Sequence, residues 1–231
     1  MYDIVYISYD ERQSDANWIK LKTKVPYAIR IHGVKGIHQA HIEAAKKAFT
    51  PMIWIVDADA CIVDDFDFSY VPNRTNRDAV HVWHSRNPIN DLEYGYGGLK
   101  LFPRIATINM DTTNLDMTTS ISNKFITMKQ VSNVTAFNTD KFSTWRSAFR
   151  ECCKLASKTI DRQNNEETEN RLHLWQTYGE ERTYGEWAIK GARAGATYGS
   201  INQDNLEALK KINNFQWLTE QFNLSFQQAD I

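Results

Sequence analysis

The sequence predicts an α/β fold with a mainly parallel central sheet flanked by helices and a more helical C-terminal part. Three observations support this prediction. Short apolar runs that suit buried strands alternate with helical patterns in the N-terminal part of the chain. Apolar residues make up 42% of the 231 residues, enough for a sizeable core. Beyond residue 140 the pattern becomes mainly helical.

The N-terminal elements follow the order typical of parallel pairing. Strands are predicted at residues 4–8, 28–32 and 52–56, with helices at 15–24 and 37–49 between them. Parallel strands place their carboxyl ends at one edge of a sheet, where ligands of such sheets bind. We therefore expect the segments that follow these three strands, 9–11, 32–35 and 57–59, to meet at one edge.

The remaining elements are less regular. Strands are predicted at 79–83, 99–102 and 131–137, and a surface loop at 110–123, which is polar and lacks periodicity. Helices are predicted at 140–158, 166–178, 184–194 and 205–222, with Gly195 as the stop of the third. Because no linker or repeat is evident, we predict a single domain over residues 1–231, with halves at about 1–100 and 101–231.

Composition excludes several classes of protein. The formal net charge of -1 argues against a uniformly basic nucleic-acid binder, although a local basic face stays open. The cysteines are Cys61, Cys152 and Cys153, an odd number without framework or zinc spacing, which fits a reducing compartment. No apolar run approaches the length of a membrane span and no secretory signal pattern is present, so we expect a cytoplasmic location and no membrane partner.

Two carboxylates follow the third predicted strand. Asp57 and Asp59 are separated only by Ala58, and in an extended backbone residues i and i+2 point the same way. Mg²⁺ usually takes one or two carboxylates together with substrate phosphates. The sequence therefore predicts a Mg²⁺ or Mn²⁺ site at Asp57 and Asp59. The plain alternative is that both are turn residues that close a strand.

This layout resembles the GT-A glycosyltransferases, in which a nucleotide-binding α/β half ends in an Asp-x-Asp motif on an internal strand. Residues 53–59 (IWIVDAD) match that strand, and residues 32–37 (HGVKGI) resemble the loop placed against the nucleotide. Residues 183–195 (TYGEWAIKGARAG) resemble the helix after the acceptor site. The resemblance implies an enzyme that moves a sugar from a nucleoside-diphosphate sugar, with UDP favoured, to a hydroxyl acceptor.

The resemblance also implies a donor site at the strand tips. Tyr9 and Asp10, beside Ser8, would contact the base or the ribose. Lys35 or Arg30 would neutralise a phosphate, as a point charge or as a fork.

The same resemblance assigns the metal ligands. Asp57 and Asp59 would hold Mn²⁺ or Mg²⁺ against the diphosphate, with Asp59 the more direct ligand. His81 or His84 are further candidates for the metal shell, although a single strand histidine is more often structural.

The catalytic base is harder to assign, because this chain lacks the Glu-Asp pair of the family. An inverting enzyme needs a carboxylate that takes the proton from the acceptor hydroxyl. The candidates, in order of preference, are Glu181, Asp91 and Glu186. A retaining enzyme would need no such base.

The acceptor expected in general is a glycan or a small molecule. A narrower hypothesis is hydroxymethylated pyrimidine in phage DNA inside the host cytoplasm, since the Asn- and Thr-rich composition resembles that of phage proteins. Between positions 20 and 47 the sequence has seven basic residues and one acidic residue, Glu43. The basic residues form either a solvated helix surface or a patch that binds phosphates. Trp83, Tyr94 and Tyr96 would stack on a flipped base.

Two alternatives use the same residues. Residues 57–61 (DADAC) nearly fit the Asp-x-Asp-x-Thr motif that opens haloacid-dehalogenase-type phosphatases, with Cys61 in place of Thr. That motif normally lies on the first strand, however, and no later Lys and Asp-Asp motifs are evident. The non-enzymatic alternative is a nucleotide-sugar-binding module without turnover, which the missing Glu-Asp pair allows.

Overall fold

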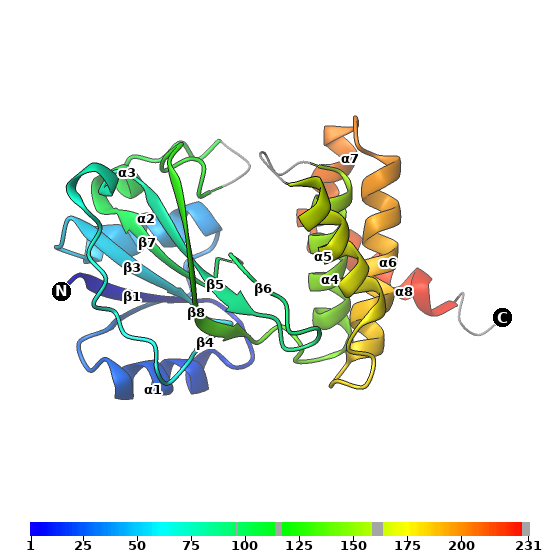
Figure 1. Cartoon of the computed structure of the whole chain (residues 1–231), viewed down its shortest axis with the longest axis horizontal. Coiled ribbons are helices and arrows are strands. Elements are labelled where there is room, and N and C mark those ends of the chain that lie inside the picture. The colour runs from blue at the N-terminus through cyan, green and yellow to red at the C-terminus, as the bar shows by residue number, and fades with distance from the viewer. Residues whose placement is uncertain (96, 114–116, 159–163, 228–231) are drawn as a thin grey trace. The chain divides into compact units, whose positions relative to one another are not determined.

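The computed structural model describes residues 1–95, 97–113, 117–158 and 164–227. The chain forms two compact units, which Figure 1 shows. Unit 1 comprises Met1–Asn87 and Glu93–Ala136, and unit 2 comprises Pro88–Leu92 and Phe137–Ile231. The α/β class and the helical character of the C-terminal part are confirmed. One functional domain that spans both units stays a prediction.

Unit 1 is built on a mixed sheet with the order β2-β1-β3-β7-β5-β8-β4, and β6 pairs with β5. β1 is parallel to β2 and β3, and β5 is parallel to β8, whereas the other pairings are antiparallel. The sheet is therefore mixed rather than mainly parallel, because β7 runs against both β3 and β5. The strands are β1 (Asp3–Ser8), β2 (Ile29–His32), β3 (Met52–Asp57), β4 (Ala60–Ile62), β5 (Val80–Arg86), β6 (Glu93–Tyr94), β7 (Leu99–Pro103) and β8 (Phe125–Thr135).

Helices cover both faces of this sheet. α1 (Ser14–Lys24) contributes Leu21 to the cluster that contains Trp54 of β3, and α2 (Ile37–Lys47) contributes Ala45 to the cluster that contains Ile53 of β3. Successive residues of β3 thus enter opposite clusters, which explains why its apolar run is continuous. The short helices are α3 (Arg104–Ile108) and the 3₁₀ turn η1 (Arg74–Asn76).

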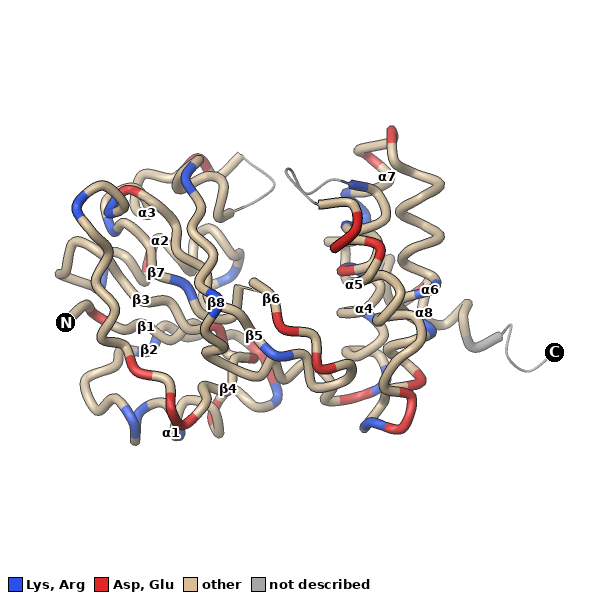
Figure 2. The backbone as a smooth tube through the Cα atoms, in the orientation of Figure 1, with Lys and Arg blue, Asp and Glu red and all other residues tan. Residues whose placement is uncertain are grey.

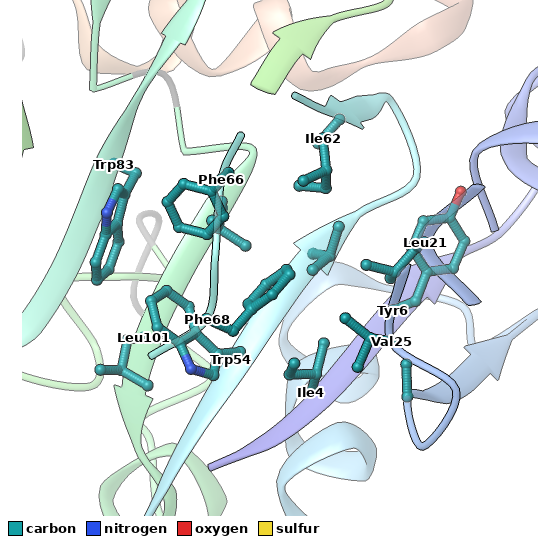
Figure 3. Packing of buried hydrophobic residues seen from close by; sticks show 14 of the residues in the cluster. Ile4, Tyr6, Leu21, Val25, Trp54, Ile62, Phe66, Phe68, Trp83 and Leu101 are labelled. Atoms are coloured by element: carbon teal, nitrogen blue, oxygen red, sulfur yellow. The ribbon is translucent and has the colours of Figure 1, made fainter. Parts of the chain in front are cut away.

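The core on the α1 face is strongly aromatic, as Figure 3 shows. The Trp54 ring lies 4.5 Å from the Trp83 ring between centroids, and Phe66 meets both indoles edge-on. Trp83 is 1% exposed and Tyr94 is 5% exposed. The hypothesis that Trp83 and Tyr94 stack on a flipped base is therefore wrong, because protein covers both rings. Tyr96, the third candidate, lies outside the described residues.

Unit 2 is helical and carries two further apolar clusters. α4 begins after Asp140, whose carboxylate accepts a hydrogen bond from the Ser143 N–H. The helix predicted at 205–222 is broken, because Asn214 ends the 3₁₀ turn η2 and its side chain accepts from the Trp217 N–H of the next helix. The elements are α4 (Lys141–Ala156), α5 (Asn165–Thr177), α6 (Gly185–Ile201), α7 (Leu206–Lys210), η2 (Lys211–Asn213) and α8 (Phe215–Gln227). Over the described ranges, no helix combines the length and the apolar character needed to cross a membrane.

The prediction that Gly195 ends its helix is wrong, because α6 continues to Ile201. The glycines of α6 at positions 191, 195 and 199 are four residues apart and share one face. A Cβ atom on Gly195 would lie 2.1 Å from the carbonyl oxygen of Phe149 in α4. Gly191 and Gly199 lie equally close to the backbone of Trp145 and Cys153. Glycine is therefore present at 195 for the close approach of two helices, not for a left-handed turn.

Gly195→Ala is expected to lower the free energy of unfolding by about 2–4 kcal/mol, because the added methyl group must push α6 away from α4. In an exposed helix the same change would stabilise the protein by about 1 kcal/mol. Urea unfolding followed by circular dichroism measures the difference. Thr197→Ala, at an exposed position of α6, is the matched control and should change stability little. A stabilised Gly195→Ala protein would contradict the close packing.

Candidate active site

The carboxyl ends of β1, β2 and β3 meet at one edge of the sheet, as predicted. The parallel registers place Ser8 opposite His32 and Ile7 opposite Asp57. The buried Ser8 hydroxyl accepts a 2.9 Å hydrogen bond from Arg30 Nε and lies 3.0 Å from His32 Nδ1. The tips of β1 and β2 are thus joined by polar contacts, and the strand register places Asp57 at the end of β3 beside β1.

The predicted nucleotide contacts differ in their surroundings. The Arg30 guanidinium pairs with Asp15 at 2.7 Å and lies over the Tyr6 ring, so it ties β2 to α1 in this structure. Lys35, in contrast, is exposed, in the loop that Gly33 and Gly36 shape with their positive φ angles of 75° and 94°.

Tyr9 and Asp10 are also exposed directly after β1. Exposure leaves both side chains accessible to a ligand, and their assigned roles stay predictions.

Asp57 and Asp59 do not both belong to an extended strand. Asp57 ends β3, and Ala58 and Asp59 form a turn into β4. The turn is fixed from α1 and β1, since the Ala58 carbonyl accepts from Asn17 Nδ2 at 2.8 Å and from the Tyr6 hydroxyl at 3.1 Å. The prediction that Asp57 and Asp59 point the same way along an extended strand is therefore wrong for Asp59, because a turn sets its direction.

The backbone nevertheless fixes both aspartates against neighbouring strands. The Asp57 N–H donates to the Gly98 carbonyl at 2.9 Å, just before β7. The Asp59 carbonyl accepts from the Ala136 N–H at 2.6 Å, just after β8. Each aspartate is thus fixed where a different strand of the sheet ends or begins.

The electrostatics of the pair are uneven. Asp57 accepts a 2.7 Å charge-assisted hydrogen bond from Lys100 Nζ, and Lys100 is only 5% exposed. Burial, and secondly the nearby charge of Asp57, raise the pKa of Asp59 to about 6, against a smaller opposing effect of Lys100. Asp59 is only partly exposed, so its carboxylate is incompletely solvated, and the charges that act on it are those of Asp57, Lys100 and Glu11.

The carboxylates of Asp57 and Asp59 suit a hard divalent cation whose other ligands come from water and a substrate. No group of three or more His, Cys, Asp or Glu side chains suited to a metal occurs among the residues that the structure describes. His81 is fully buried beside the rings of Tyr70 and Trp83, which favours a structural role over a place in the metal shell. Two carboxylates alone match Mg²⁺ or Mn²⁺ with water and phosphate as the other ligands, rather than a closed structural site.

Lys100 is the site residue that the sequence analysis missed. It stands in the middle of β7 (LKLFP), where both neighbours and the next residue are buried and apolar. A buried charge needs a partner, since breaking such a pair costs several kcal/mol. A single lysine in an otherwise apolar strand was therefore the available signal that a carboxylate lies opposite.

Two of the three candidate bases lie around one arginine in unit 2. Arg182 contacts Asp91 at 2.8 Å and Glu181 at 3.6 Å. Asp91 has a left-handed backbone, with φ of 55°. Glu186, in the first turn of α6, contacts Lys190 at 4.0 Å. The structure thus brings Glu181 and Asp91 together and gives Glu186 a different partner.

Glycines make this arrangement possible. A Cβ on Gly179 would lie 2.1 Å from the Ile89 carbonyl oxygen, and a Cβ on Gly185 would lie 1.8 Å from the Gly179 carbonyl oxygen. The segment 88–92 therefore packs directly on the loop 179–185, which carries Glu181 and Arg182.

The basic residues at positions 20–47 do not form one patch. Those of α1 and those of α2 belong to helices on opposite faces of the sheet, and Figure 2 shows Lys and Arg spread over several elements of unit 1. Lys20 pairs with Asp64, and Lys46 pairs with Glu43. The solvated-surface interpretation is therefore favoured over a continuous phosphate-binding patch.

A separate cavity of about 510 Å³ lies among α4, α5 and α6 of unit 2. Its lining mixes apolar residues such as Leu155 with polar ones such as His173 and Gln176. None of the predicted site residues lines it.

Neither a protein-family model nor a curated protein sequence matches the chain. Among solved structures, the chain is similar to the mannosyltransferase PcManGT from Pyrobaculum calidifontis, determined in complex with GDP-mannose and Mn²⁺. The identity is 15%, the match covers 99% of this chain and 84% of that one, and the TM-score is 0.42. The function proposed below rests on the residues at the strand edge of unit 1 and not on this likeness.

Proposed function

We propose that the chain is a metal-dependent glycosyltransferase that moves a sugar from a nucleoside-diphosphate sugar, with UDP favoured, to a hydroxyl acceptor. The observation that carries the proposal is the pair Asp57 and Asp59 at the polar edge of three parallel strands, with one buried lysine on Asp57 and an incompletely solvated carboxylate at Asp59. Ligands of α/β sheets bind at such edges.

The residues of unit 1 would divide the work of donor binding. Asp59 would be the more direct ligand of Mn²⁺ or Mg²⁺, and Asp57, oriented by Lys100, the second. The metal supplies charge stabilisation for the departing nucleoside diphosphate. Lys35 would neutralise a phosphate from its glycine-flanked loop, while Tyr9 and Asp10 would contact the base or ribose.

The candidates for the catalytic base are three carboxylates of unit 2. In an inverting reaction Glu181 or Asp91 would accept the proton of the acceptor hydroxyl, with Arg182 holding Asp91 in a fixed orientation. Glu186 is the third candidate. Turnover by Glu181→Gln, Asp91→Asn and Glu186→Gln proteins separates the three.

The acceptor proposed is a glycan or a small molecule, and hydroxymethylated pyrimidine in phage DNA is the narrower proposal, to be tested with modified duplexes in a transfer assay. The dispersed basic residues and the buried Trp83 and Tyr94 lower the support for DNA. A cytoplasmic location also stays a proposal.

Calorimetric titration tests the donor site. We expect one nucleoside diphosphate from a panel that includes UDP to bind at least about tenfold more tightly with Mn²⁺ than with EDTA, because without the metal the carboxylates of Asp57 and Asp59 repel the diphosphate.

Failure of every nucleotide to bind, with or without Mn²⁺, would overturn the proposal, and hydrolysis of p-nitrophenyl phosphate would then test the phosphatase alternative. Metal-dependent binding of a sugar nucleotide without hydrolysis or transfer would indicate the non-catalytic module.

A further inference from the structure

The cavity of unit 2 lies between α5 and α6, at the end of α4, and Figure 1 shows these three helices side by side. Its volume of about 510 Å³ lies within the range of about 300–1,000 Å³ that is usual for small-molecule sites. α6 contributes Ala196 and Ser200, which are one turn apart. α5 contributes four residues that share one face over two turns: Glu169, Leu172, His173 and Gln176.

The lining combines an apolar floor with polar side chains at the mouth. Leu155 is 0% exposed, and Ala156 and Leu172 are each 8% exposed, so these residues form the floor. His173 and Ser200 are exposed and lie at the mouth. Binding sites for small molecules commonly combine apolar surface with a few polar groups of fixed orientation, and the cavity is open to such a ligand.

Two side-chain amides of the lining are held by the backbone. Gln176 Nε2 donates to the Leu172 carbonyl at 2.9 Å, and Gln203 Nε2 donates to the Ala156 carbonyl at 3.3 Å. Each of these bonds uses one of the two N–H groups of an amide, which leaves the second N–H and the amide oxygen able to bond a ligand. A side chain that is already fixed loses little conformational freedom on binding, so both amides are suited to recognition.

The chemistry of the lining favours an uncharged ligand that carries hydroxyl groups. Lys158 and Glu169 have opposite charges, whereas a phosphate or a carboxylate calls for cations without an opposing acid. A purely apolar ligand would cover the amides of Gln176 and Gln203 without bonding them, which is costly. A sugar has hydroxyls that both donate and accept, and C–H groups that can lie on the apolar floor.

The cavity extends along α5 from the loop that carries two residues of the candidate site. Gln176 lies in the last turn of α5, just before the loop 179–185 with Glu181 and Arg182. Glu169 lies two turns earlier, about 10 Å along the helix axis. A chain of sugars whose reacting end lies at this loop would place its further units along α5.

We propose that this cavity binds an uncharged sugar unit of the acceptor, which is therefore an oligosaccharide rather than a single sugar. Gln176 and Gln203 supply hydrogen bonds to its hydroxyls, and Leu155 and Leu172 supply the apolar surface. This inference rests on the proposed function, since it names the class of the acceptor.

Calorimetric titration with neutral trisaccharides, without metal or nucleotide, tests the proposal. The probes are maltotriose, cellotriose, mannotriose and chitotriose. We expect one of them to bind the wild type, and Gln176→Leu or Gln203→Leu to weaken it about tenfold, because either change removes the bonds of one amide. Ser200→Phe, at an exposed position of α6, should abolish binding by filling the cavity. Gln216→Leu, which changes an exposed glutamine of α8, is the matched control.

Failure of every trisaccharide to bind, or unchanged binding in the three cavity variants, would overturn this inference and leave the proposed function to the nucleotide titration. Binding that the cavity variants lose, in a protein that binds no nucleotide, would overturn the proposed function and with it the role of the cavity in an acceptor site. The thermal unfolding midpoint of each variant shows whether it is folded. If a glutamine variant does not fold, Ser200→Phe decides.

Discussion

Asp59→Asn is expected to remove the Mn²⁺-dependent part of nucleoside-diphosphate binding, a loss of at least about 100-fold, because the amide gives up the charge that holds the cation. The same change should not destabilise the metal-free protein at pH 7.5. Burial and the charge of Asp57 raise the pKa of Asp59 to about 6, so its charged form is unfavourable in the fold. Asparagine keeps the shape and removes that charge.

The pH dependence of stability follows from the direction of this pKa shift. The folded protein binds the Asp59 proton more tightly than the unfolded chain does, so wild-type stability falls as pH rises from about 4 to about 6 and then stays lower. With allowance for the part-exposure of the side chain, the deficit is on the order of 1–2 kcal/mol.

Urea unfolding in EDTA measures this deficit. The free energy of unfolding of Asp59→Asn should exceed that of the wild type at pH 7.5 and equal it near pH 4. Asp64→Asn, an exposed aspartate of the same unit, is the control and should change binding little. If Asp59→Asn unfolds the protein while the survivors still bind nucleotide, Asp59 is structural.

Lys100→Met is expected to have the opposite effect on stability. Methionine retains most of the apolar volume of lysine within β7 but leaves the Asp57 carboxylate without its counterion beside Asp59. Removing one partner of a buried pair costs about 3–5 kcal/mol, and the part-exposure of Asp57 reduces this to about 2–3 kcal/mol. At the same time two uncompensated carboxylates should bind Mn²⁺ about tenfold more tightly without nucleotide.

Thermal unfolding with and without Mn²⁺ tests both effects together. The metal should raise the unfolding midpoint of Lys100→Met more than that of the wild type, because at a given concentration a ligand that binds the folded state more tightly stabilises it more. The double variant Asp57→Asn/Lys100→Met should recover much of the lost stability, since it leaves no unpaired charge. Lys129→Met, on an exposed position of β8, is the control. Unchanged stability in Lys100→Met would show that the pair contributes nothing.

The N-terminal half of unit 1 could be predicted from the sequence because its signals are local. β1, β2 and β3 are apolar runs between helical patterns, so their parallel direction follows from chain connectivity. The pairing of β7 against β3 could not be predicted this way, since antiparallel entry depends on contacts between distant segments.

The candidate site shows the same division. Asp57 and Asp59 are two residues apart in the sequence and were found, whereas Lys100 is 43 residues away from its partner and was not. The role of Gly195 was predicted wrongly for a related reason. A glycine in a helical pattern gives the same local signal whether it ends the helix or allows a second helix to pack closely. Only the position of the Phe149 backbone distinguishes the two.

The segment Pro88–Leu92 has a consequence for how the gene can be divided. It lies between β5 and β6 of unit 1, yet its Ile89 is buried in the apolar cluster of unit 2 with Trp175 and Phe137. Unit 2 is therefore not encoded by one continuous stretch. A fragment that begins at residue 137 would lack Ile89, which packs in this cluster. A fragment that ends at residue 136 would contain Ile89 without the helices against which it packs. Evolutionary exchange of unit 2 as a cassette would accordingly require that both of its segments be exchanged together.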